Sequence, residues 1–173
     1  MGEEEPRSAK TIAAAATEVD MDKTALLNEI RYSERLCQRT ARLYRRLSAT
    51  FLFLGITGGS AVLANIKPIL PDWVSIAGGS LMAVFVALNI VIRPTEKAVA
   101  NEIDAKRYAR LRTEAAHMSY AELSAAIDKA RESDTQEVEP LRDVAFNDVV
   151  TEYGRADAVV QLSAQQRLLK AVA

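Results

Sequence analysis

Cysteine and histidine are almost absent from this chain of 173 residues, which contains one of each. Cys37 has no second thiol with which to form a disulfide within the chain, so we interpret it as a small residue that packs between helices. His117 has no cysteine or acidic residue near it at the spacing of a metal site or a catalytic triad. The sequence therefore predicts neither a bound metal nor another cofactor.

Glycine-rich phosphate loops, nucleophile elbows and dinucleotide fingerprints are missing outside the apolar stretches of the sequence. Glycine and proline, with seven and five copies, are also too few outside those stretches to provide the turns of a sheet. Acidic pairs such as Glu102/Asp104 and Glu137/Glu139 lie among balancing basic residues, which is typical of solvated helix faces. We therefore expect an all-α protein that is not an enzyme.

Charged residues are absent from two stretches, residues 47–66 and 73–92. Each has about the 20 residues that a helix needs to cross the hydrocarbon core of a bilayer. The connector between them, residues 67–72, contains two prolines and is too short to hold a soluble domain. The sequence predicts a two-helix transmembrane hairpin with residues 67–72 as its loop.

Positive charge is concentrated at one end of the predicted hairpin. Many arginines and lysines precede residue 47 or follow residue 92, whereas the loop contains only Lys67. Because basic flanks stay in the cytoplasm, we expect both termini to be cytoplasmic and the loop to be external. The acidic start of the chain is unlike a cleavable secretory signal.

The residues before the first span predict a tail and a helix. Residues 1–19 offer little apolar surface, and we expect them to be disordered. Asp20 and Asp22 are suitable helix caps, and no proline interrupts residues 22–66. Residues 20–46 should therefore form a cytoplasmic helix continuous with the first span.

After the second span, residues 93–173 predict a cytoplasmic helical region. Pro94 should break the helix, with Thr95 capping its continuation, and the sequence Ser119-Tyr120-Ala121-Glu122 reads as a capping box. Further helices are expected over residues 141–153 and 156–173, separated by Gly154. The apolar stripes of these helices are narrow, which favours a homo-oligomer.

Small and polar residues interrupt the two spans. Gly55 and Gly59, and likewise Gly79 and Ala83, have the spacing that lets helices approach closely, either within the hairpin or between subunits. The polar candidates for a pore lining or a span interface are Thr50, Thr57, Ser60 and Asn89. Hydroxyl groups in such helices also bond to their own backbone, so both interpretations stay open. The absence of ionisable residues argues against a proton-coupled transporter.

Three segments carry a resemblance to a known family: Glu29-Ile30-Arg31-Tyr32-Ser33, Arg42-Leu43-Tyr44-Arg45-Arg46 and Lys106-Arg107-Tyr108-Ala109-Arg110-Leu111. With the hairpin between the second and the third, the chain resembles the SLATT family over about residues 22–165. The resemblance implies a two-transmembrane effector of bacterial anti-phage defence, thought to form pores in the inner membrane. Some relatives respond to cyclic nucleotides and others, in Hailong-type systems, to short DNA oligomers made by a partner nucleotidyltransferase.

The residues and the resemblance together predict a homo-oligomeric, multi-pass channel of the bacterial inner membrane that acts in abortive infection. A nucleotide or short oligonucleotide from an associated nucleotidyltransferase would gate it from the cytoplasmic bundle, and a phage-side trigger is a further partner. Candidate contacts for the anionic ligand are Arg107, Arg110, Arg112, Arg155, Arg167 and Lys170. These cations could instead satisfy the positive-inside rule or surface pairing.

Two other functions remain open on the sequence. A membrane-anchored scaffold could recruit a partner through the same helical region without conducting ions. A phage hole-forming lysis protein would have a similar hairpin, but its cytoplasmic region would usually be shorter than residues 93–173.

Overall fold

The computed structural model describes the backbone of residues 5–64, 71–135 and 137–173, with side chains over 22–63, 71–135 and 137–173. These residues form helices and contain no strand, so the predicted all-α fold is confirmed. The six α-helices are α1 (Glu5–Ala64), α2 (Asp72–Ile92), α3 (Pro94–Glu114), α4 (Tyr120–Glu132), α5 (Arg142–Glu152) and α6 (Ala164–Val172). Short 3₁₀ helices occupy Ala115–His117, Glu139–Leu141 and Ala156–Ala158.

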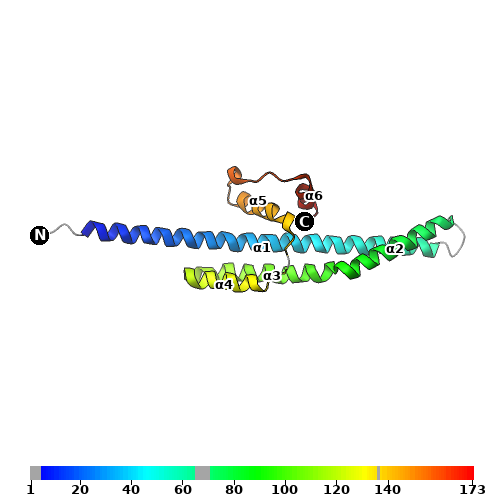
Figure 1. The fold of residues 1–173 in the computed structure, drawn as a ribbon, viewed down its shortest axis with the longest axis horizontal. Helices are drawn as coiled ribbons and strands as arrows, with labels where there is room; N and C mark the ends of the chain where they lie inside the picture. Colours follow the sequence, from blue (N-terminus) through cyan, green and yellow to red (C-terminus); the bar gives the residue numbers. More distant parts are fainter. Residues whose placement is uncertain (1–4, 65–70, 136) are drawn as a thin grey trace.

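Helix α1 is the longest helix, and each of the other α-helices packs against it. At a rise of about 1.5 Å per residue, its 60 residues span about 90 Å. Helix α2 crosses it near the end far from the N-terminus, α3 and α4 lie along one side of its middle, and α5 and α6 lie along the other (Figure 1). One helix does run without a break into the first apolar stretch, as the absence of proline predicted.

The start of α1 differs from the prediction. The helix begins at Glu5, whereas we expected a disordered tail over 1–19 and a helix start at Asp20. Four consecutive alanines at positions 13–16 have the highest intrinsic helix propensity, and Pro6 is tolerated because it lies in the first turn. Asp20 and Asp22 are therefore interior residues of α1 and not its caps.

Two hydrophobic clusters hold the helices to opposite sides of α1. The first joins α1 to α3 and α4 and contains Ile30, Cys37, Ala105, Tyr108, Leu111, Ala115, Leu123, Ile127 and Ala130. The second joins α1 to α5 and α6 and contains Leu36, Leu141, Val144, Ala145 and Ala173. The middle of α1 is thus buried on both sides. We call α1 from residue 22 to 46 together with α3 to α6 the helical body, and residues 47–64 with α2 the apolar hairpin.

The break between α2 and α3 falls where proline predicted it. Arg93 lies in the left-handed region (φ 50°, ψ 52°), a conformation that costs a non-glycine residue about 1–2 kcal/mol, and Pro94 is the first residue of α3. Thr95 is not the cap that we expected. Its hydroxyl forms a hydrogen bond of 2.9 Å with that of Ser48, and this bond ties the start of α3 to α1.

The later helix boundaries are partly as predicted. The capping box at Ser119 and Glu122 is present, and Gly154 ends its segment with a φ of +71°. The last helix, in contrast, begins at Ala164 and not at residue 156. The buried amide of Asn147 accepts a hydrogen bond from the Val160 N–H (2.8 Å) and donates one to the Val160 carbonyl (2.7 Å). These two bonds hold residues 159–163 in a non-helical conformation.

Candidate functional site

The surface of the apolar hairpin is made of exposed apolar side chains. Phe53, Ile76 and Val91 are 68%, 70% and 79% exposed, and many other large apolar residues of both helices are exposed as well. By length and composition, both helices could cross a membrane. A contiguous apolar surface of this size marks a region that is covered by lipid or by protein.

The two helices of the hairpin approach most closely at Gly58 and Gly78. A Cβ atom on Gly58 would lie 2.5 Å from the Gly78 carbonyl oxygen, and a Cβ atom on Gly78 would lie 2.7 Å from the Gly58 oxygen. Both distances are too short for a side chain. Backbone therefore packs directly on backbone, as it does where small residues mediate helix contact in membranes.

The small residues that the spacing singled out lie beside this contact. A Cβ atom on Gly55 or Gly79 would meet only a valine methyl group, at 3.9 and 3.5 Å, and one on Gly59 would lie 3.2 Å from the Met82 sulfur atom. Ala83 is exposed. The closest contact within the hairpin does not run through these four residues, and their role between subunits stays a prediction.

The hydroxyl groups of the hairpin are bonded locally. Thr50, Thr57 and Ser60 donate to the carbonyl oxygens four residues earlier, at 2.9, 2.8 and 2.9 Å. This is the second of the two interpretations that the sequence left open for them. Asn89 differs, because its side chain makes no hydrogen bond within the described residues.

A groove on one side of the hairpin gathers four of the eight span candidates. Its volume is about 560 Å³, and Gly55, Gly59, Ser60 and Asn89 line it together with larger apolar side chains. Phe51 and Phe85, whose ring centroids are 5.7 Å apart, border it. The other four candidates, Thr50, Thr57, Gly79 and Ala83, are not among the residues that line the groove.

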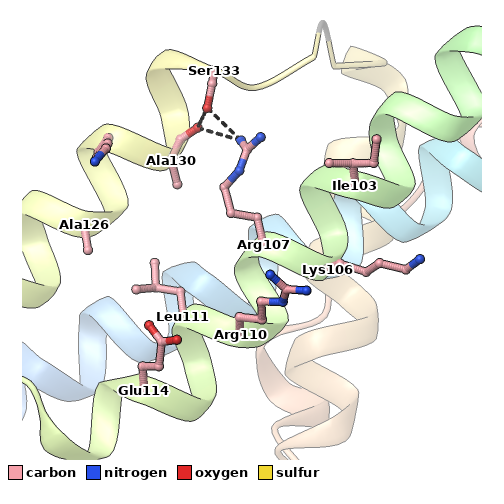
Figure 2. Close-up of a pocket in the computed structure, with 10 residues that line it drawn as sticks. Ile103, Lys106, Arg107, Arg110, Leu111, Glu114, Ala126, Ala130 and Ser133 are labelled. Carbon is pink, nitrogen blue, oxygen red and sulfur yellow. Dashed lines mark hydrogen bonds between the residues drawn. The ribbon is translucent and has the colours of Figure 1, made fainter.

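A second cavity, of about 570 Å³, lies in the helical body between α3 and α4. We call it the basic pocket, because it is bordered by the cations Lys106, Arg107, Arg110 and Lys129 and by one carboxylate, Glu114. Figure 2 shows Arg107 reaching from α3 toward the end of α4, while Lys106 turns away from α4. The remaining wall is mostly apolar, with Ile103, Leu111, Ala126 and Ala130.

Arg107 is already bound within the protein. Its guanidinium donates to the Ser133 hydroxyl (2.8 Å) and to the Ala130 carbonyl (3.3 Å), and it pairs with Asp104 (3.2 Å) and Asp134 (3.6 Å). Asp134 also accepts a hydrogen bond from Tyr108, and burial raises the pKa of its carboxyl group. Arg107 therefore holds the segment after α4 against α3.

The other cations of the basic pocket are available to a ligand. Within the described residues, Lys106, Arg110 and Lys129 form no ion pair and no side-chain hydrogen bond. An anion entering this cavity would meet two unpaired cations, Arg110 and Lys129, and a single carboxylate, whereas Lys106 turns away from α4 (Figure 2). Arginine and lysine side chains are the charged groups with which proteins commonly bind phosphate.

The six predicted anion contacts do not form one site. Only Arg107 and Arg110 line the basic pocket. Arg112 pairs with Glu34 at 3.3 Å, and Arg155 pairs with Asp157 at 3.0 Å beside a different groove, between α1 and α5. Arg167 donates to the Leu162 carbonyl at 3.2 Å, and it belongs with Lys170 to α6, on the other side of α1.

Sequence reasoning missed two cations of the basic pocket and both glycines of the close contact. Lys106 lies four residues before Arg110 on α3, so a search for basic pairs at helical spacing would have found it. Lys129 belongs to α4, and no local sequence pattern predicts that α4 folds back onto α3. Gly58 and Gly78 are each followed directly by a second glycine, Gly59 and Gly79. Spacing in the sequence does not show which glycine of each pair forms the contact.

The two rare side chains lie in different surroundings. Cys37 is buried in the first cluster, and burial raises the pKa of its thiol to about 12. His117 ends a 3₁₀ helix and is exposed. In the part of the chain that the structure describes, no group of three or more histidine, cysteine or acidic residues could hold a metal ion.

Comparisons of the chain with family models, with curated proteins and with solved structures found no match.

Proposed function

We propose that this chain is a membrane protein whose copies assemble through their hairpins and make the membrane permeable to ions, under the control of a nucleotide-type ligand. The observation that carries this proposal is the exposed apolar hairpin with one groove that is lined by glycine, serine and asparagine residues. A single hairpin cannot enclose a path for water, so conduction requires several copies.

The arginine and lysine distribution supports a bacterial inner-membrane protein with both termini in the cytoplasm. The exposed surface of α2 and of residues 47–63 would then face lipid or other copies, and the helical body would lie in water on the cytoplasmic side. The resemblance to the SLATT family adds a role in defence against phage and a ligand made by an associated nucleotidyltransferase.

Asn89 is the best candidate for the pore lining or the subunit contact. An amide without a hydrogen bond is unfavourable by several kcal/mol in the hydrocarbon core, so Asn89 needs water or a neighbouring copy as its partner. Ser60 shares its groove, which gives that surface a second polar group. Thr57 is a weaker candidate than we expected, since it lies outside the groove and its hydroxyl bonds to Phe53.

The basic pocket is the best candidate for the ligand site. Arg110 and Lys129 would contact phosphate groups, and the apolar wall would receive the less polar part of a nucleotide. Helix α3 is joined directly to α2 at Arg93 and Pro94, so a ligand that moves α3 would act on the hairpin at once. Such a ligand shifts the closed-to-open balance only by its difference in affinity for the two states.

Ion flux from liposomes tests the conduction. Purified full-length protein should release potassium when the correct cyclic nucleotide or short DNA oligomer is present or withdrawn. Asn89→Leu should reduce the flux, with the oligomer unchanged if Asn89 lines the pore and weakened if it forms the subunit contact, whereas Thr57→Val should leave the flux unchanged. An oligomer that passes no ions under any of these conditions would favour a scaffold.

Charge reversal tests the ligand site. Arg110→Glu should raise the ligand concentration needed for half of the response, while the flux that the protein reaches in its conducting state stays close to the wild-type value. Arg155→Glu is the matched control, because Arg155 borders another groove. Equal loss of response in both variants would remove the basic pocket from the proposal.

A further inference from the structure

Helix α6 has one apolar face that the fold leaves uncovered. Leu162 and Leu169 pack against the second cluster, but Leu168 is 67% exposed and Val172 is 39% exposed. Leu168 and Val172 are four residues apart, so they share one side of the helix. Among the described residues outside the hairpin, no large apolar side chain is more exposed than Leu168.

The end of α6 is anchored where the helical body meets the hairpin. Arg39 donates to the Lys170 carbonyl at 3.3 Å, and Arg46 donates to the Ala171 carbonyl at 3.0 Å. Arg46 directly precedes Leu47, the first residue of the uncharged stretch. Figure 1 shows α6 on the side of α5 that is nearer to the hairpin. The apolar face of α6 therefore lies at the level of α1 where a membrane boundary would fall.

Three cations accompany this exposed apolar face on α6 and on the part of α1 that contacts it. Arg167 and Lys170 of α6 are exposed, as is Arg46 of α1, which contacts the end of α6. A short helix with exposed apolar residues on one side and cations nearby is typical of helices that lie in the surface of a membrane. Basic residues beside such a helix add attraction to anionic headgroups.

We propose, resting on the proposed membrane insertion of the hairpin but not on conduction, that α6 lies in the membrane interface and binds anionic lipid. Leu168 and Val172 enter the boundary between headgroups and acyl chains, and Arg167 and Lys170 contact lipid phosphates. The α5–α6 side of the body is then fastened to the membrane, while the α3–α4 side with the basic pocket is free to move. Ligand-driven motion would be confined to one side of α1.

Fluorescence of a label on α6 tests this placement. In full-length protein with Cys37→Ser, Leu168→Cys carries an environment-sensitive probe, and the protein is reconstituted in phosphatidylcholine vesicles with or without phosphatidylglycerol. The label should show a blue-shifted emission and quenching by brominated lipids, more strongly with phosphatidylglycerol. Arg167→Gln with Lys170→Gln should remove that lipid dependence. Ala125→Cys on the exposed surface of α4 is the matched control and should not be quenched.

A label at Val84, which is 54% exposed on α2, separates the two proposals. Quenching at Val84 without quenching at Leu168 would overturn the placement of α6 and leave the insertion of the hairpin intact. No quenching at either position would overturn the insertion itself. A blue-shifted Leu168 label that brominated lipids do not quench would show that a second copy covers α6, and this too would overturn the lipid contact.

Discussion

Helix α1 passes through two regions that are built in opposite ways. In the helical body, large apolar side chains such as Ile30 and Leu36 point inward, and ion pairs such as Arg31–Glu152 lie near the surface. In the hairpin, Gly58 and Gly78 are in buried contact, and most of the large apolar side chains are exposed. One continuous helix is thus suited to two surroundings.

The difference predicts how each region is stabilised. The body gains free energy by removing apolar area from water, so it should be sensitive to the loss of large side chains. The hairpin depends on close backbone packing, so even a small side chain added at the glycine contact should destabilise it. Substitutions of each type can test the contrast.

The largest effect is expected at the centre of the body. Tyr108 is fully buried and donates a hydrogen bond to Asp134. Tyr108→Ala should lower the free energy of unfolding of the body by about 3–5 kcal/mol, as for other buried aromatic residues. Denaturant unfolding of the full chain in detergent, followed by circular dichroism, measures it. Tyr120→Ala is the control, because Tyr120 is 42% exposed, and an equal loss there would contradict the assigned core.

The hairpin should show the reverse behaviour. Gly58→Ala should destabilise it by about 1–3 kcal/mol, because the new methyl group would overlap the Gly78 backbone. Gly55→Ala has room beside Val86 and should be neutral, or stabilising by up to about 1 kcal/mol, since alanine favours helix. Thermal unfolding in detergent compares the two. If both substitutions stabilise equally, the helices do not touch at Gly58.

The charge pairs of the body should differ with their exposure. Arg39 binds Asp148 through two hydrogen bonds of 2.7 and 3.0 Å, and the two side chains are only 15% and 17% exposed. Asp148→Asn should destabilise the contact between α1 and α5 by about 1–2 kcal/mol. Asp157→Asn should have no measurable effect, because water screens that pair with Arg155. Equal effects would mean that burial does not set the strength of these pairs.

The smallest effect concerns the reactivity of a thiol. Cys37 is 8% exposed, and burial raises its pKa to about 12, so the thiolate is scarce at pH 7 to 8. A maleimide should modify it only after the body unfolds, and the labelling rate should rise steeply with denaturant. Rapid labelling of the native protein would show that α1 and α3 separate easily.

Local patterns predicted the features that depend on local chemistry. The uncharged stretches, the break at Pro94, the capping box at Ser119 and the turn at Gly154 each follow from one short segment. The closest glycine contact and the basic pocket depend on how separate helices meet. The crossing of α1 and α2 places Gly58, and not Gly59, against Gly78. Lys129 reaches the basic pocket only because α4 folds back on α3.

The last helix shows why propensity alone was insufficient. Residues 156–163 were predicted to be helical, and their composition does not forbid it. The paired hydrogen bonds between Asn147 and Val160 favour another conformation, and the capping box of Ser163 and Gln166 then starts α6. A tertiary contact from a residue 13 positions away thus set the boundary.

Two residues of the predicted external loop, Pro71 and Asp72, lie within the described residues and are exposed. Residues 67–70, including Ile69, lie outside the described residues, whereas Asp72 begins α2 and is exposed. A cysteine at Asp72, in protein with Cys37→Ser, serves as the probe of the outer side. Val84 serves for the middle of α2 and Glu132, exposed at the end of α4, for the helical body.

Labelling of these three cysteines in intact cells is the most direct test of the claim that the hairpin is in the membrane and the body in water on its inner side. The reagent is a maleimide on a polyethylene glycol chain too large to pass a helix-lined pore. We expect Asp72→Cys to react from outside, Glu132→Cys to react only after the cells are opened, and Val84→Cys to react only after denaturation. Reaction of Val84→Cys as readily as Glu132→Cys in opened cells would contradict the account.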